Sequence, residues 1–108
     1  MPYDHNLAER VSKILSTENP AEKKMFGGVG YLINGNMACG VHTDNLIVRV
    51  GKDQYIKSLN LPHVKPFDLT GKAMSGWVEV LPAGTKDDNT LAEWIRMGVD
   101  FARTLPPK

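Results

Sequence analysis

The chain has 108 residues, of which 42% are hydrophobic and 23% are charged, with a formal net charge of +1 at pH 7. This length and composition are typical of one globular domain with its own core, so we expect residues 1–108 to form a single domain. A near-neutral charge argues against strong direct binding of nucleic acid, which is usually a property of clearly basic domains.

One cysteine excludes an internal disulfide bond and favours a reducing compartment. No apolar run is long enough to predict a membrane span, and the first residues lack the basic and apolar segments of a signal peptide. These features predict a cytoplasmic protein that does not associate with membranes.

The first predicted element is a helix over residues 4–17. Leu7, Val11, Ile14 and Leu15 recur at helical spacing and form one apolar stripe. Pro20 ends the helix, because the residue before a proline is displaced from the α region. Residues 21–24 are polar and are expected to be a short entry to the first strand.

Residues 25–50 predict an antiparallel meander of three strands, since apolar and β-branched runs alternate with turn residues. Asn34-Gly35 is the strongest signal, because Asn followed by Gly suits the positive φ angles of a type I′ hairpin turn. The register expected from this turn pairs Ile33 with Asn36, Tyr31 with Ala38, Val29 with Gly40, Leu32 with Met37, Gly30 with Cys39 and Gly28 with Val41.

Both faces of this predicted hairpin are apolar, which predicts that both are covered. Its glycine run, residues 27–30, lacks the further glycine and the following helix of a dinucleotide-binding loop. We therefore interpret these glycines as strand residues that permit bending and close packing, not as a phosphate cradle.

The second half of the chain predicts a short helix over residues 52–59, an extended or edge segment over 62–68 and a strand region over 75–81. A final helix follows, with Thr90 and Glu93 as a capping box and Pro106-Pro107 as its end. The order α-β-β-β-α-β-(β)-α predicts an α+β fold with an antiparallel sheet of about four to five strands and helices on one face.

No catalytic or metal-binding pattern is evident. The three histidines have no metal-pair spacing, Cys39 is expected to be a buried small apolar residue, and His42 with Asp44 is interpreted as turn chemistry. Glu79 is expected on a solvated strand face. We predict a protein that is not an enzyme and that needs no cofactor or metal.

Arg49 interrupts an apolar strand and is the most distinctive charge. Its guanidinium either reaches a carboxylate or water beside the sheet, or recognises a carboxylate or phosphate on the open face. Trp77 and Tyr31 are expected on that uncovered side, so Tyr31, Arg49 and Trp77 are the candidate binding residues.

Several motifs resemble the N-terminal domain of the TfoX/Sxy competence regulators. Residues 24–31 (Lys-Met-Phe-Gly-Gly-Val-Gly-Tyr), Asn34-Gly35-Asn36-Met37 and residues 46–50 carry the likeness, as do later residues up to Leu105. The motif residues interpreted as structural are Met25, Phe26, Gly27, Gly28, Gly30, Asn34, Gly35 and Trp94.

The resemblance implies a two-layer fold similar to secretion chaperones, present here as a stand-alone domain, and a link to the regulation of competence genes. It supplies no catalytic residues. Our leading hypothesis is a regulatory interaction domain with a protein partner or a second copy of itself. The alternatives are a binder of small anions or nucleotides through Arg49, and a weak DNA-associated co-regulator.

Overall fold

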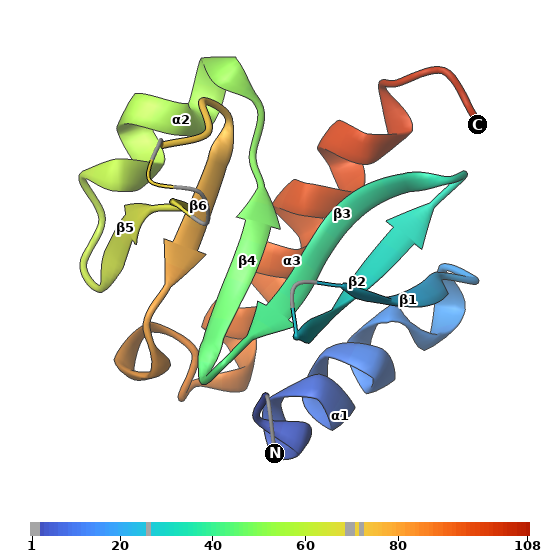
Figure 1. Cartoon of the computed structure of the whole chain (residues 1–108), viewed down its shortest axis with the longest axis horizontal. Helices are drawn as coiled ribbons and strands as arrows, with labels where there is room; N and C mark the ends of the chain where they lie inside the picture. Colours follow the sequence, from blue (N-terminus) through green and yellow to red (C-terminus); the bar gives the residue numbers. More distant parts are fainter. Residues whose placement is uncertain (1–2, 26, 69–70, 72) are drawn as a thin grey trace.

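A computed structural model describes residues 3–25, 27–68, 71 and 73–108 of the chain. Within these residues, three α-helices pack against one six-stranded sheet (Figure 1). The elements are α1 (His5–Ile14), the 3-10 turn η1 (Leu15–Thr17), β1 (Ala21–Met25), β2 (Gly28–Ile33), β3 (Asn36–His42), β4 (Asn45–Arg49), α2 (Lys52–Leu59), β5 (Val64–Pro66), β6 (Trp77–Val80), the 3-10 turn η2 (Pro82–Gly84) and α3 (Asp88–Arg103).

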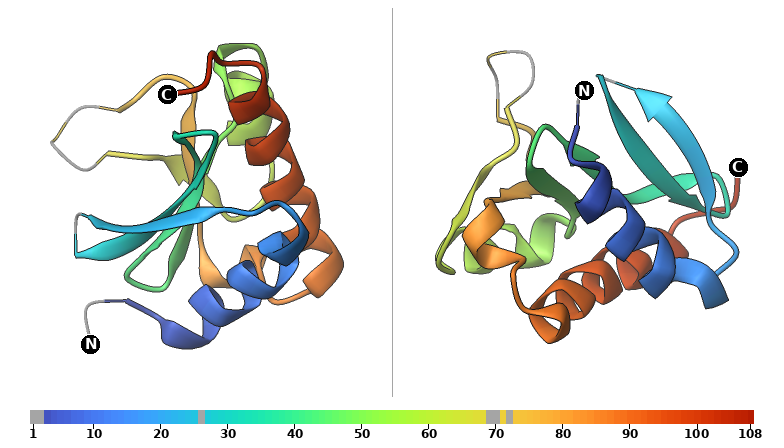
Figure 2. Two further views of the ribbon diagram at one scale, coloured as in Figure 1. Left: turned by 90° about the vertical axis from the view of Figure 1, so that its right-hand side faces the viewer. Right: turned by 90° about the horizontal axis from the view of Figure 1, so that it is seen from below.

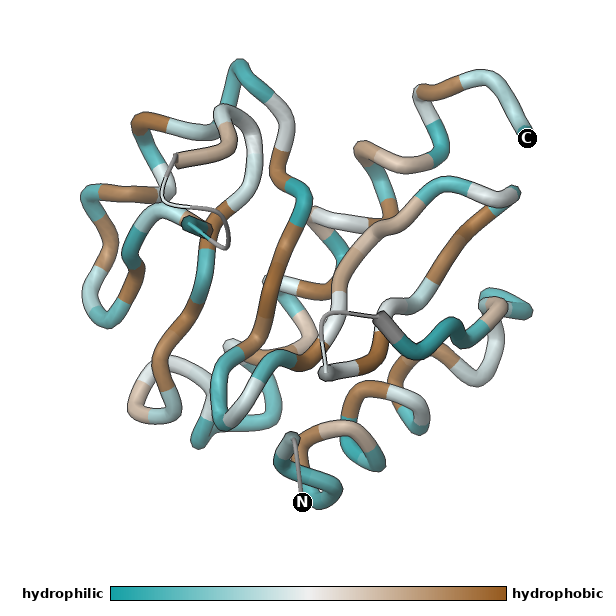
Figure 3. Tube along the Cα trace, viewed as in Figure 1, coloured by the Kyte–Doolittle hydropathy of each residue, from teal (hydrophilic) through white to brown (hydrophobic). Residues whose placement is uncertain are grey.

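The sheet is antiparallel throughout, with the strand order β1-β2-β3-β4-β6-β5. The predicted α+β fold is confirmed, and the expected four to five strands are close to the six observed. The additional strand is β1 (Ala21–Met25), of which residues 21–24 were expected to be a short polar entry to the first strand. Figure 3 shows β1 as a hydrophilic trace, which explains why its sequence lacks the alternation of a half-buried strand.

The Asn34-Gly35 turn is confirmed, because both residues have positive φ angles, 54° and 83°. From this turn the predicted register holds as far as Leu32 opposite Met37. The register then shifts between Tyr31 and Leu32, which is typical of a β-bulge.

The bulge corrects the remaining predicted pairs of this hairpin. Tyr31 lies opposite Cys39, Val29 opposite Val41, and Gly30 opposite Gly40. Each predicted partner was wrong by one residue, because the bulge adds one residue to β3 and local turn chemistry does not reveal it.

The glycine-rich segment is strand scaffold, as predicted. Gly27 has a φ angle of 74° between β1 and β2, and Gly28 opens β2 opposite Met25, the last residue of β1. A Cβ atom on Gly28 would lie 2.0 Å from the carbonyl oxygen of Val41, so this position needs a residue without a side chain. The motif residue Phe26 lies outside the described residues.

Helices cover one face of the sheet. The two side views in Figure 2 place α1 and α3 on the same side, and Ser58 of α2 lies 3.8 Å from the sulfur of Met97 in α3. The main core lies between the two layers and contains the motif residue Trp94. Sheet residues in this core include Val29, Tyr31, Cys39, Val41, Leu46, Val48, Val78 and Val80.

The last helix begins earlier than its predicted capping box. Asp87 is the N-cap, and its carboxylate accepts hydrogen bonds from the backbone N–H and the hydroxyl of Thr90. Thr90 is therefore inside the helix, and the predicted box of Thr90 with Glu93 is wrong. Asp87 provides the same chemistry three residues upstream.

Among the described helices, none combines the length and the apolar character needed to cross a membrane.

Candidate functional site

The candidate site lies on the sheet face opposite the helices, which we call the open face. Residues paired across neighbouring strands share a face, and the core residues Leu46 and Val48 alternate along β4 with the residues of this side. The open face is formed by Asn45, Ile47 and Arg49 of β4, His42 of β3, Trp77 and Glu79 of β6, and Lys65 of β5.

Arg49 and Trp77 are direct cross-strand partners on this face. Arg49 is the last residue of β4, and its guanidinium reaches from the open face toward the helix layer: its carbon lies 5.1 Å from the centre of the Trp77 ring and 5.5 Å from that of Phe101 in α3. These distances are those of cation–π contacts, which orient a guanidinium without occupying its N–H groups. Within the described residues, no carboxylate forms an ion pair with Arg49.

Phe67, which follows β5, lies across the same face. Its ring centre is 6.3 Å from that of Trp77 and 6.4 Å from that of His42. Phe67 and Ile47 are each only 2% exposed, although both lie outside the main core. The open face therefore has a small apolar cluster of its own beside β4 and β6. The prediction that both faces are covered was made for the β2–β3 hairpin, where Leu32 and Met37 are half-buried.

Glu79 occupies the centre of a polar cluster beside these aromatic residues. Its residue surface is 7% exposed, and one carboxylate oxygen accepts a hydrogen bond of 2.6 Å from the side-chain amide of Asn45. Lys65 Nζ lies 3.9 Å from the other oxygen. The expectation of a solvated Glu79 is wrong, because neighbouring strands and their side chains remove this position from water.

His42 completes the polar cluster. Its Nδ1 atom is 4.0 Å from Oε2 of Glu79, and no described residue accepts or donates a hydrogen bond at this buried nitrogen. A distance of 4.0 Å exceeds the hydrogen-bond range, so Glu79 does not hold His42 in the way an orienting carboxylate holds a catalytic base. The arrangement suits recognition of a polar group more than proton transfer.

Tyr31 does not belong to the open face, which corrects its predicted position. It is 0% exposed, its hydroxyl donates to the backbone oxygen of Ala8 at 3.0 Å, and it accepts from Ser12 at 3.3 Å. Burial raises the pKa of the Tyr31 phenol above its usual value. The β-bulge places this ring against α1, so Tyr31 acts in the core and not in an exposed binding surface.

Cys39 is also a core residue, as expected from its strand. Complete burial raises the pKa of its thiol to about 12. A thiol held neutral in this way lacks the thiolate needed for nucleophilic attack or metal binding. Across the described residues, no group of three or more histidine, cysteine or acidic side chains is placed to hold a metal ion.

The structure therefore brings together two of the three predicted binding residues, Arg49 and Trp77, and adds Glu79, Asn45 and His42. The alternation with Val78 and Val80 already predicts that Glu79 shares a face with Trp77, but it does not predict that Glu79 is nearly buried. Asn45 and His42 come from a turn that is distant in sequence, and nothing in their local pattern points to Glu79.

Comparison with protein families gives one match, to the family described as the TfoX N-terminal domain, over residues 15–102. No curated protein and no solved structure matches the chain, so the likeness to secretion-chaperone folds stays a prediction.

Proposed function

Because the chain belongs to the TfoX N-terminal domain family, whose model covers most of its length, we propose that it is a non-enzymatic regulatory domain that binds a protein partner through the open face. The regulated process that the family suggests is the control of competence genes. The single cysteine and the absence of a disulfide suit activity in the cytoplasm.

One observation supports the open face above other surfaces: Arg49 is stacked on Trp77 beside the polar cluster around Glu79. Arginine and tryptophan are among the residues that most often contribute large binding energies at protein interfaces. A planar guanidinium held by aromatic rings keeps its N–H groups in a fixed direction, which reduces the entropy lost when a partner carboxylate or carbonyl binds.

Affinity capture from the native organism tests this proposal. The wild-type chain and the double variant Arg49→Ala/Trp77→Ala are compared after circular dichroism has shown that both are folded. We expect the double variant to lose a partner that the wild type retains. Arg49→Lys should also lose most binding, because an ammonium group cannot replace a stacked planar guanidinium.

A matched control removes two exposed apolar residues from another surface. Ile56 and Leu61 are 67% and 46% exposed near α2, so Ile56→Ala/Leu61→Ala tests whether any loss of apolar surface has the same effect. Equal capture by the wild type and the open-face variant, or equal loss in the control, would contradict the proposal.

A second candidate function is the binding of a small anion, and the absence of an ion-pair partner for Arg49 among the described residues favours it. Thermal-shift measurements with phosphate, nucleotides and carboxylic acids test it. A stabilising shift that disappears in Arg49→Ala supports this function, whereas no shift, or an equal shift in the variant, contradicts it. The near-neutral net charge makes a strong direct contact with DNA the weakest candidate.

A further inference from the structure

The exposed side of α3 carries a regular series of opposite charges. Glu93, Arg96, Asp100 and Arg103 are all exposed, and they alternate in sign from the start of the series to its end. At about 100° per residue, these four positions fall within roughly 80° of the helix circumference. They therefore form one narrow charged stripe along the helix.

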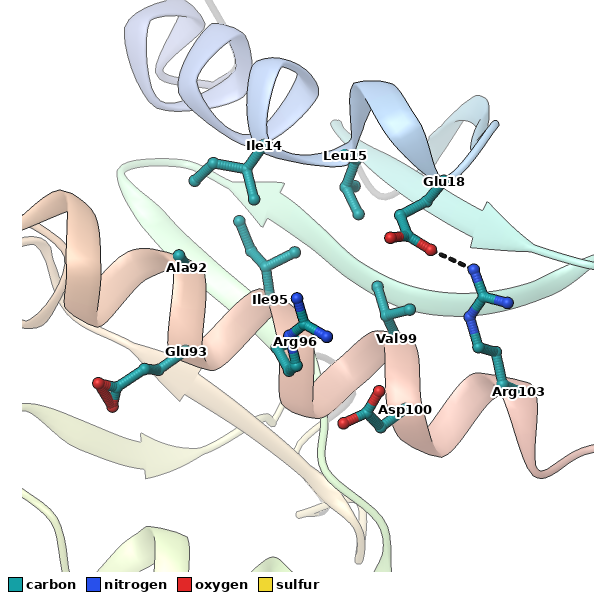
Figure 4. A pocket seen from close by; sticks show the side chains of 10 residues that line it. All are labelled: Ile14, Leu15, Glu18, Ala92, Glu93, Ile95, Arg96, Val99, Asp100 and Arg103. Atoms are coloured by element: carbon teal, nitrogen blue, oxygen red, sulfur yellow. Dashed lines mark hydrogen bonds and ion pairs between the residues drawn. The ribbon is translucent and has the colours of Figure 1, made fainter.

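Grooves lie on both sides of this stripe. One, of about 540 Å³, separates α3 from α1 and η1 and is lined by Ile14, Ile95 and Val99 (Figure 4). The other, of about 770 Å³, lies toward the start of α2 and is lined by Met97 and Phe101. The stripe is thus a ridge between two partly apolar depressions, a shape that can interlock with a ridge of the same kind.

The stripe is complementary to itself when its direction is reversed. Position 98 is the midpoint of Glu93 and Arg103, and it is also the midpoint of Arg96 and Asp100. A second α3 that runs antiparallel, with its position 98 level with the first, therefore places every acid opposite a base. A parallel copy in register would place like charges opposite one another.

We propose that the chain forms a two-fold symmetric homodimer in which the two copies of α3 pack antiparallel through this stripe. Arg96 of each protomer pairs with Asp100 of the other, and Arg103 pairs with Glu93. The contact is isologous, so each pair occurs twice around the symmetry axis. The half-buried apolar side chains beside the stripe, Ile14, Met97 and Phe101, supply the apolar contact area.

The charge pattern favours a second copy over a partner of another kind. The stripe has no net charge, so neither an acidic nor a basic partner gains a general electrostatic advantage. Arg103 pairs with Glu18 within the chain, whereas the described residues provide no ion pair for Glu93, Arg96 or Asp100. Arg96 and Asp100 therefore remain available for contacts between protomers, and Glu93 approaches an Arg103 that it shares with Glu18 of that protomer.

Charge-reversal variants studied by sedimentation velocity test this dimer. Wild type is expected to dimerise, and the dimer should weaken as salt is added. Arg96→Asp and Asp100→Arg each replace two attractive pairs by repulsive ones, so each variant alone should dimerise at least about tenfold more weakly. An equimolar mixture of the two variants should form a heterodimer, because the acid introduced at position 96 of one chain then faces the base introduced at position 100 of the other.

The mixture separates contacts between chains from effects within one helix. Each variant keeps its own like charges at positions 96 and 100 in the mixture, so only an interchain contact restores association. Two controls make the same changes in net charge elsewhere: Lys57→Asp on α2 and Glu22→Lys on β1, both exposed. Both controls should dimerise as wild type does.

A wild type that stays monomeric at millimolar concentration overturns the proposal. Single variants that dimerise like wild type, or a mixture that does not associate, also overturn it. Because Arg49 packs on Phe101, a wall of one of these grooves, Trp77→Ala alone is the variant that separates the two surfaces: it should leave the dimer intact, and Arg96→Asp should still capture the open-face partner. Failure of one proposal is therefore distinguishable from failure of the other.

Discussion

Glu79 shows how one carboxylate is kept in a nearly buried position of the sheet. Its neighbours come from two distant segments, since His42 and Asn45 flank the turn between β3 and β4 and Lys65 lies in β5; only Asn45 lies within hydrogen-bond distance. When a buried carboxylate loses its hydrogen-bond donor, nothing offsets the free-energy cost of removing the carboxylate from water. The short contact with Asn45 is therefore the one whose removal should be most costly.

Asn45→Ala tests this account of Glu79. We expect a loss of about 1–3 kcal/mol in the free energy of unfolding, because the variant leaves a nearly buried carboxylate without its donor. Denaturant unfolding at pH 7 measures the loss. In the control Asn60→Ala, the lost hydrogen bond to the backbone of Ile56 is exposed, and the change should stay within about 0.5 kcal/mol. Equal losses in the two variants would show that Glu79 does not depend on Asn45.

Cys39 makes stability depend on pH in the alkaline range. The folded state raises the pKa of its thiol from an ordinary value near 9 to about 12, so the folded protein retains a proton that the unfolded chain releases. This stabilising contribution is complete below pH 9 and decreases as the pH rises toward 12. Each pH unit within that range costs roughly 1.4 kcal/mol of stability.

The comparison of wild type with Cys39→Ala isolates this effect from that of Tyr31, whose raised pKa acts in the same direction. From pH 8 to pH 10.5 the wild type should lose about 2 kcal/mol more stability than the variant. Without denaturant, a thiol reagent should not modify Cys39 at neutral pH. Rapid labelling of the native protein, or the same pH slope in both chains, would contradict a buried neutral thiol.

At the scale of elements, α3 lies unusually close to the sheet at Gly98. A Cβ atom there would be 2.3 Å from the carbonyl oxygen of Ala38 in β3 and 3.4 Å from a methyl group of Val48. The oxygen belongs to the backbone of a paired strand, so it has little freedom to move. Gly98 therefore sets the distance at which the helix packs on β3 and β4.

Gly98→Ala is expected to destabilise the fold by about 3 kcal/mol, because the strain of overpacking exceeds the gain in helix propensity of roughly 1 kcal/mol. Thermal and denaturant unfolding measure this loss. The control is Asn89→Ala, at an exposed position of the same helix. It should change the free energy of unfolding by no more than about 0.5 kcal/mol. A neutral or stabilising Gly98→Ala would mean that α3 can move away from the sheet at little cost.

In the β2–β3 hairpin, the turn and the strand register have different causes. Its turn is determined by two residues, Asn34 and Gly35, whose φ angles are positive. Its register beyond Leu32 is determined by the bulge, which directs Tyr31 toward Ala8 and Ser12 of α1. The same hairpin turn is compatible with either register, so packing against the helix decides between them.

At the scale of the whole molecule, stability should decrease from the centre of the sheet to its edges. β3, β4 and β6 each have strand neighbours on both sides and contribute to the core, whereas β1 and β5 each pair with one strand only. The three residues of β5 and the exposed side chains of residues 21–24 in β1 provide little apolar burial. Local opening should therefore begin at these two edges.

Native-state hydrogen exchange tests this order. Backbone amides of β3 and β4 that bond to neighbouring strands should exchange slowest, at rates that follow global unfolding. Those of β1 and β5 should exchange at least about tenfold faster. Protection of β1 equal to that of β3 would contradict the order and would indicate that another surface covers the β1 edge.

Local chemistry within the sequence was sufficient to predict the helices, the Asn34-Gly35 turn, the strand of Trp77 and the α+β class, because periodicity and turn preference depend on neighbouring residues. It also placed Arg49 and Trp77 on one side of the sheet, since alternation along a strand is local. The predicted binding role of these two residues is not decided by this placement and stays a prediction.

Only the tertiary structure decided the rest: the strand β1, the bulge that directs Tyr31 to the core, and the burial of Glu79. Each depends on partners far away in the chain, as Asn45 is from Glu79, and the free energy of such contacts is not encoded in the local pattern. A polar segment becomes an edge strand because β2 offers it hydrogen bonds, and a carboxylate is buried because three other strands surround it.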